Sequence, residues 1–170
     1  MGADLYINKV RDPIKAEWQP KFDAAVAQRE AATDDAGRAA AQKLVDEAYD
    51  HIFGGDGYFR DSYNGTSILG RLGLSWWQDL EYDVEYDDAT DSYPGGNNVS
   101  AEACKRFLEK VRARGAPSIA TEAELRSRHC SVDNGENSVE SWNKYFAEKH
   151  GRLMAFLERA IENGGMYAST

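Results

Sequence analysis

The chain has 170 residues, of which 42% are hydrophobic and 29% charged, and it carries a formal net charge of -9 at pH 7. This composition excludes a disordered chain, and a chain of this length can bury a continuous core. No apolar run approaches the roughly 20 residues that a membrane span needs, so we expect no membrane partner. The sequence therefore predicts a single globular domain over residues 1–170. The N-terminus lacks the basic and apolar regions of a secretion signal, which predicts a cytoplasmic location.

Two alanine-rich segments in the first third of the chain have the apolar spacing of helices. Pro20 is placed to begin the first helix, because proline is favoured in the first helical turn. In the second segment four apolar residues are spaced to share one face: Ala40, Leu44, Ala48 and Ile52. Polar residues around Asp34 separate the two segments, so we expect an antiparallel helical hairpin.

Further helices and two short strands are expected in the rest of the chain. A short helix containing Ile68 follows Asn64 or Thr66 as its cap. A longer helix begins after Ser100, and a last helix ends before residues 163–165. The two ends of the chain are strand-like and are expected to pair as a small ribbon. The predicted fold class is mainly α, with about five helices, a hairpin near the N-terminus and a minor β component.

The acidic charge is concentrated in one segment. Between Arg71 and Lys105 there is no Lys or Arg, and this window holds eight acidic residues: Asp79, Glu81, Asp83, Glu85, Asp87, Asp88, Asp91 and Glu102. Removing these eight from the 29 acidic residues leaves 21 against 20 basic ones, so the remainder is nearly neutral. A localised negative field attracts a cationic partner and repels nucleic acid.

Residues 80–87 alternate apolar and acidic side chains without exception, which is the period of a half-buried strand. A strand would place one set outward as a row of carboxylates: Glu81, Asp83, Glu85 and Asp87. The spacing of Trp77, Leu80 and Val84 also fits a helix, so both structures remain open. The alternative interpretation of these carboxylates is structural: they form the solvated face of a strand, and their charges discourage pairing with the strand edge of another chain.

Two further features adjoin this segment. Trp76 and Trp77 are neighbours, and neighbours on a regular element point in different directions, so one is expected to be buried and the other available. A glycine-rich aromatic loop offers an alternative pocket beside them, with the residues Tyr58, Arg60, Asp61, Tyr63 and Asn64. An internal hydrogen-bonded turn between Arg60 and Asp61 explains those two residues equally well.

Signatures of catalysis and metal binding are missing from the sequence. There is no Cys-x-x-Cys or His-x-x-x-His spacing for zinc, and the acidic segment lacks the glycine and glutamate positions of an EF-hand. We therefore predict no catalytic residue, no metal and no cofactor. Cys104 and Cys130 leave a disulfide open, because a domain of this size does not require one.

The sequence thus predicts a non-catalytic protein-interaction module that binds a basic partner surface and does not bind nucleic acid directly. The predicted partner-binding residues are Trp76, Trp77, Asp79, Glu81, Asp83, Glu85, Asp87 and Asp88. A specific version of this hypothesis is an inhibitor of a nucleic-acid-binding machine, of the kind that phages deploy against host defences. The alternative is a small enzyme or ligand-binding protein with a pocket between the 57–64 loop and the two tryptophans.

Overall fold

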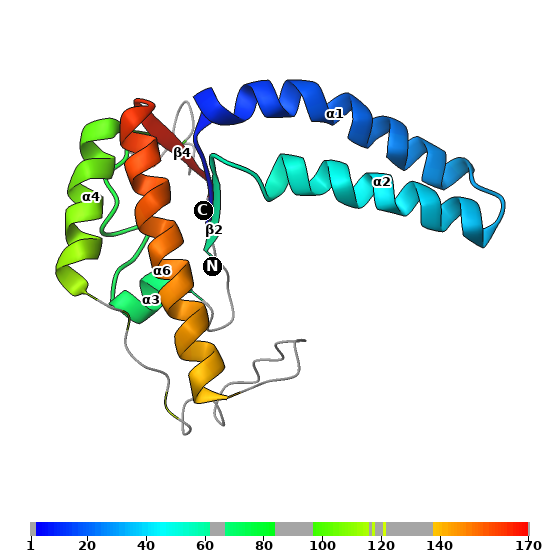
Figure 1. Cartoon of the computed structure of the whole chain (residues 1–170). Coiled ribbons are helices and arrows are strands. Elements are labelled where there is room, and N and C mark those ends of the chain that lie inside the picture. Colours follow the sequence, from blue (N-terminus) through cyan, green and yellow to red (C-terminus); the bar gives the residue numbers. More distant parts are fainter. Residues whose placement is uncertain are drawn as a thin grey trace, which may run out of the picture. The chain divides into compact units, whose positions relative to one another are not determined.

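The computed structural model describes residues 3–61, 67–83, 97–115, 117, 121 and 138–169. Five helices and four strands lie within these ranges, and the fold is mainly helical as predicted (Figure 1). The chain divides into two compact units, one formed by Ile7–Tyr58 and the other by Met1–Tyr6 together with Phe59–Thr170. Among the described residues, no helix combines the length and apolar character that crossing a membrane requires.

The unit Ile7–Tyr58 is the predicted antiparallel hairpin, made of α1 (Asn8–Ala31) and α2 (Asp35–Phe53). Asp34 begins α2 as its N-cap, because its carboxylate accepts a hydrogen bond from the backbone N–H of Gly37 over 2.6 Å. Arg29 and Gln42 join the two helices through a hydrogen bond of 3.0 Å. The polar break around Asp34 therefore forms the hairpin turn, as the sequence predicts.

Two details of the predicted hairpin are wrong. First, α1 begins at Asn8 rather than Pro20, so that Pro13 and Pro20 both lie inside it. Second, the buried face of α2 consists of Ala41, Val45, Ala48 and Ile52, while Ala40 and Leu44 are exposed. The physical reason for the second error is the helical period: a strict spacing of four residues drifts around a helix of 3.6 residues per turn, whereas spacings of four, three and four follow it.

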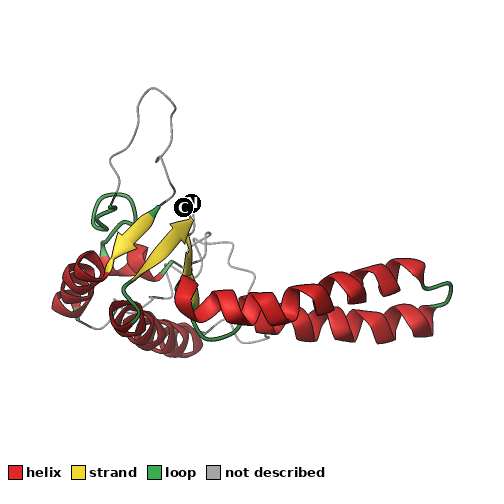
Figure 2. Cartoon of the chain, turned by 90° about the horizontal axis from the view of Figure 1, so that it is seen from above, coloured by secondary structure: helices red, strands yellow, loops and turns green. Residues whose placement is uncertain are grey.

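The other unit contains a four-stranded sheet in the order β2-β1-β4-β3. Its strands are β1 (Ala3–Tyr6), β2 (Tyr58–Asp61), β3 (Asn98–Ser100) and β4 (Gly165–Ser169), and the first residue of β2, Tyr58, falls at the end of the hairpin unit. Strands are yellow in Figure 2. The predicted pairing of the two chain ends is confirmed, because β1 and β4 are antiparallel with Leu5 opposite Ala168. On its other side β4 pairs with β3, where Val99 lies opposite Met166.

Three helices belong to the same unit: α3 (Ile68–Leu72), α4 (Ala101–Arg114) and α6 (Val139–Glu162). Ser67 caps α3, in place of the predicted Asn64 or Thr66. Ser100 caps α4 as predicted, and Ser138 forms a capping box at the start of α6. The helices α4 and α6 pack on each other and against the sheet, and their buried side chains form much of the core, including Phe107, Val111, Phe146, Leu153 and Leu157.

The predicted strand over 80–87 is described only in its first half. Residues 80–83 form neither strand nor helix. Leu80 is nevertheless buried and Tyr82 half-buried, while Glu81 and Asp83 are exposed, so the expected alternation of inward and outward side chains is present there. Glu85, Asp87 and Asp88 lie outside the described residues.

Candidate functional site

The residues Trp76–Asp83, which we call the Trp76–Asp83 segment, begin in a turn that is closed by hydrogen bonds between Ser75 and Asp79. Asp79 makes two hydrogen bonds with Ser75: its carboxylate accepts from the Ser75 backbone N–H over 2.8 Å, and its own N–H donates to the Ser75 carbonyl over 3.0 Å. The Ser75 hydroxyl also accepts from the backbone N–H of Trp77 over 3.2 Å. The backbone that carries both tryptophans is therefore held by bonds within the turn.

The two tryptophans differ in the way the sequence predicts. Trp76 is 6% exposed, and its ring packs against Phe107 of α4 with centroids 5.3 Å apart. Its indole Nε1 donates to Asp61 over 3.0 Å, so the polar edge of the buried ring is satisfied. Trp77 is 43% exposed. Trp76 therefore anchors the segment, and Trp77 offers an aromatic side chain to solvent.

Two predicted partner-binding carboxylates meet basic residues of α4. Arg106 donates to one oxygen of Glu81 from Nε over 3.0 Å and from Nη2 over 2.6 Å. Lys110, one turn further along α4, donates to the backbone carbonyl of Asp79 over 2.8 Å and lies 3.9 Å from its carboxylate. The hydrogen bond from Arg106 lowers the pKa of Glu81, although exposure of the pair keeps its contribution to stability small.

Asp83 also has local partners. Its carboxylate accepts from the backbone N–H of Ser100 over 3.1 Å, and its own N–H donates to the carbonyl of Asn98 over 2.9 Å. Asp83 thus connects the segment to the start of α4. Nearby Cys104 is a free and buried thiol, and burial, followed by the charge of Asp83, raises its pKa to about 12.

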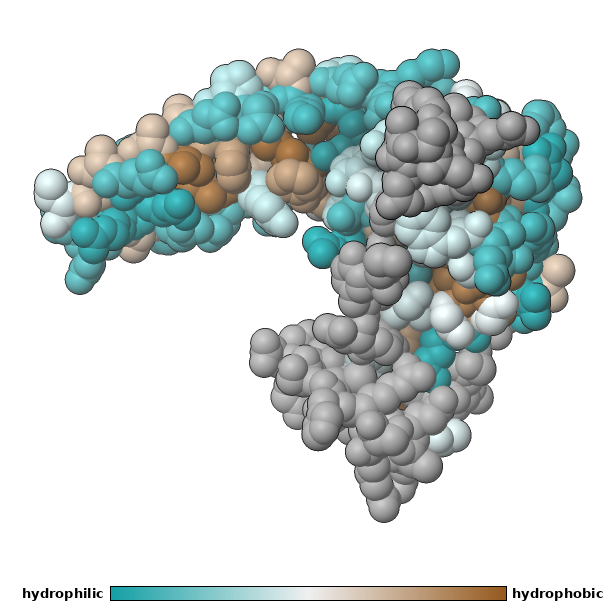
Figure 3. Space-filling model, turned by 180° about the vertical axis from the view of Figure 1, so that it is seen from behind, coloured by the Kyte–Doolittle hydropathy of each residue, from teal (hydrophilic) through white to brown (hydrophobic). Residues whose placement is uncertain are grey.

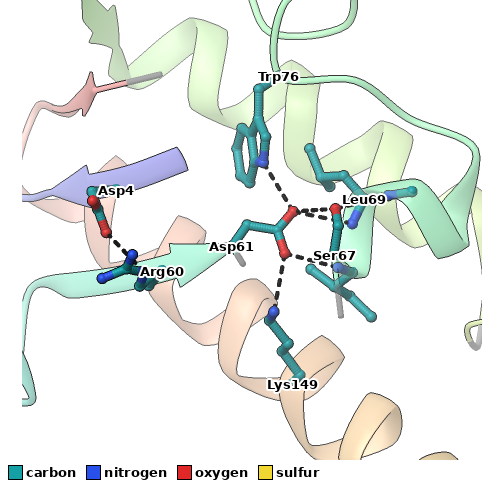
Figure 4. Close-up of polar contacts among 9 residues, drawn as sticks. Asp4, Arg60, Asp61, Ser67, Leu69, Trp76 and Lys149 are labelled. Atoms are coloured by element: carbon teal, nitrogen blue, oxygen red, sulfur yellow. Dashed lines mark hydrogen bonds and ion pairs between the residues drawn. The ribbon is translucent and has the colours of Figure 1, made fainter. Parts of the chain in front are cut away.

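Asp61 is the most heavily bonded side chain near Trp76, and it is only 1% exposed (Figure 4). One oxygen accepts from the backbone N–H of Ile68 over 2.8 Å and pairs with the Lys149 ammonium at 3.1 Å. The other accepts from the Ser67 hydroxyl, the Leu69 N–H and the Trp76 indole at 2.7, 3.4 and 3.0 Å. Both oxygens are occupied, so the carboxylate acts as a structural acceptor that joins β2, α3 and α6.

The residues of the alternative pocket are only partly brought together. The structure places Asp61 against Trp76, but as a hydrogen-bonded part of the core. The predicted turn between Arg60 and Asp61 is wrong, because alternate residues of β2 point to opposite faces of the sheet. Asp61 faces inward to Lys149, while Arg60 faces outward and lies 3.7 Å from Asp4. Tyr63 and Asn64 lie outside the described residues, and Tyr58 belongs to the hairpin unit.

The sequence offered no signal for the pairing of Asp61 with Lys149. The two residues are far apart along the chain. The available signal concerns burial alone: Lys149 stands at an apolar position of α6, three residues after Phe146 and four before Leu153. A buried ammonium needs a counter-ion, but the spacing does not say which carboxylate supplies it. Within the ranges that the structure describes, no group of three or more His, Cys, Asp or Glu side chains is arranged to hold a metal ion.

Comparison of the chain with protein-family models, with curated proteins and with solved structures gives no match.

Proposed function

We propose that the protein is a non-catalytic interaction protein that binds a basic surface of another protein through Trp77 and the acidic residues that follow it in the sequence. The observation that carries this proposal is the 43% exposure of Trp77 on a turn whose backbone is already fixed. Tryptophan is enriched among the residues that dominate binding energies, and a turn whose backbone is already ordered adds little backbone entropy cost on binding.

The acidic residues after Asp83 supply the charge in this proposal. Asp79, Glu81 and Asp83 are bonded to neighbouring groups, whereas the sequence continues with Glu85, Asp87, Asp88 and Asp91 before any basic residue appears. Such a run favours a partner rich in Lys and Arg and disfavours direct binding of nucleic acid. One specific form of the proposal is an inhibitor that covers the basic surface of a nucleic-acid-binding machine, as phage anti-defence proteins do.

The test is capture of binding partners from an extract of the source cells by the immobilised chain. Trp77→Ala and the triple variant Glu85→Gln, Asp87→Asn, Asp88→Asn should each reduce capture of the main partner by about tenfold or more. Tyr145→Ala is the matched control, because Tyr145 is an aromatic side chain of similar exposure, 39%, in the same unit. Capture should also fall steeply as salt rises.

Capture that survives both variants and is insensitive to salt would reject the proposal. If a partner is found, it should bind its nucleic acid less tightly in the presence of the unmodified chain. The Trp77 variant should not compete in this way.

A further inference from the structure

One side of the α1–α2 hairpin carries apolar side chains that the contact between the two helices leaves partly uncovered. We call it the Tyr49 face, and its apolar members are Phe22, Val26, Tyr49 and Phe53. Tyr49 is 47% exposed and the other three are half-buried. Figure 3 shows the hairpin from one side, with apolar residues gathered between its two helices and hydrophilic residues on either side of them.

Helical spacing and one hydrogen bond place these side chains on a single side of the hairpin. Tyr49 and Phe53 are four residues apart on α2, and their ring centroids lie 4.6 Å from each other. On α1, Val26 is four residues after Phe22 and three before Arg29, so all three share one side. Gln42 lies seven residues, or two turns, before Tyr49. Because Arg29 donates to Gln42 over 3.0 Å, the two helix sides adjoin.

Carboxylates edge this face on both helices. Asp46 and Asp50 are exposed and follow Gln42 at intervals of four residues, and Gln42 donates to Asp46 over 2.7 Å. On α1, Asp23 is exposed and accepts from Gln19 over 2.9 Å. Basic residues on this side stand towards its ends, with Lys15 two turns before Phe22 at one end, and Arg29, which bonds Gln42, and Arg38, which pairs with Asp35, at the other. The middle of the face is therefore apolar with acidic edges.

We propose that the Tyr49 face binds an amphipathic helix of another protein, one with an apolar stripe bordered by Lys and Arg. A helical hairpin that receives a third helix along its open side forms a small bundle, and the partner's apolar stripe would cover Phe22, Val26 and Phe53 with Tyr49 as the central aromatic anchor. The carboxylates of Asp23, Asp46 and Asp50 select a basic border by charge complementarity. This surface shares no residue with the one built around Trp77.

The experiment uses the full chain and a fluorescein-labelled helical peptide of leucine and lysine, about 18 residues long, with leucines at helical spacing. Binding is followed by fluorescence anisotropy. The variant Asp46→Asn, Tyr49→Ser, Asp50→Asn should weaken binding by about tenfold or more, since it removes the anchor and two carboxylates. The matched control is Glu17→Gln, Leu44→Ser, Glu47→Gln. Leu44 is as exposed as Tyr49, at 47%, and five residues from it, about 140° around the helix.

The control variant should bind the peptide within about twofold of the unmodified chain, because it removes the same number of carboxylates from other positions of the hairpin. A peptide of leucine and glutamate should not bind. Equal weakening by both variants, or no weakening by the first, would overturn the proposal. Circular dichroism checks that both variants stay helical, and the single substitution Tyr49→Ser gives a second, milder measurement with an expected loss of about threefold. Trp77→Ala should leave peptide binding unchanged, so failure here is distinct from failure of the function proposed for Trp77.

Discussion

The buried pair of Asp61 and Lys149 should dominate the stability of the sheet-containing unit. The side chains of Lys149 and Asp61 are 6% and 1% exposed, so the pair is shielded from water and from salt. Replacing Asp61 with Asn removes the carboxylate that pairs with the buried Lys149 ammonium at 3.1 Å. Breaking one side of a buried ion pair costs about 3–5 kcal/mol, a large share of the roughly 5–15 kcal/mol that stabilises a typical protein.

The two halves of the pair should not be equivalent. Lys149→Met removes the ammonium but leaves Asp61 with four other donors, on Ser67, Ile68, Leu69 and Trp76. We therefore expect Lys149→Met to cost about 1–3 kcal/mol, less than Asp61→Asn. In the double variant the buried ammonium is gone, so the total should be smaller than the sum of the two single costs.

Urea unfolding followed by circular dichroism measures these free energies, and Lys144→Met serves as a control because Lys144 is exposed on the same helix. The control should change stability by less than about 0.5 kcal/mol. An Asp61→Asn variant within about 1 kcal/mol of the unmodified chain, or one that is less destabilised than Lys149→Met, would contradict the central role of this carboxylate.

Three further predictions concern other parts of the chain. Pro20 has no N–H to donate within α1, so Pro20→Ala should stabilise the hairpin by up to about 3 kcal/mol and slow amide hydrogen exchange along α1; faster exchange would contradict this. Burial lowers the pKa of His150 below its ordinary value of 6.5, and its buried Nε2 has no hydrogen-bond partner. Below about pH 6.5, His150 therefore binds a proton more readily in the unfolded chain than in the folded chain, so the free energy of unfolding should fall as pH drops. The fall should be shallower in the variant His150→Gln. The pKa of Cys104, about 12, predicts that its thiol reacts with a disulfide reagent at pH 8 only as fast as the chain unfolds.

Local sequence patterns predicted much of the fold because they depend on neighbouring residues. The hairpin follows from two apolar periodicities around Asp34, and the start of α4 follows from the capping preference of Ser100. The beginning of α1 was predicted too late because a proline is more often the first residue of a helix than an internal one. Packing between the two hairpin helices overrides that preference here, since α1 passes through both Pro13 and Pro20.

The candidate site was less predictable because its decisive contacts join residues distant in sequence. Because Trp76 and Trp77 are adjacent, the sequence predicts that one is buried and the other exposed. The hydrogen-bond partner of the Trp76 indole, Asp61, lies 15 residues away and could not be predicted in this way. Glu81 meets Arg106 across 25 residues, and Asp79 meets Lys110 across 31. No periodicity encodes such pairings, which arise when α4 packs beside the turn.

These pairings change what the concentration of acidic residues means. The acidic window contains no Lys or Arg in the sequence, but the fold brings both residue types beside it. Arg106 and Lys110 lie one turn apart on α4 and contact Glu81 and Asp79. A cationic partner that bound Glu81 would have to displace a guanidinium already in place, and the exchange of one exposed ion pair for another yields little free energy. Within the described ranges no basic side chain is paired with Trp77, which is 43% exposed, so binding there replaces water. The expected binding energy therefore shifts from the first carboxylates of the segment to the exposed indole.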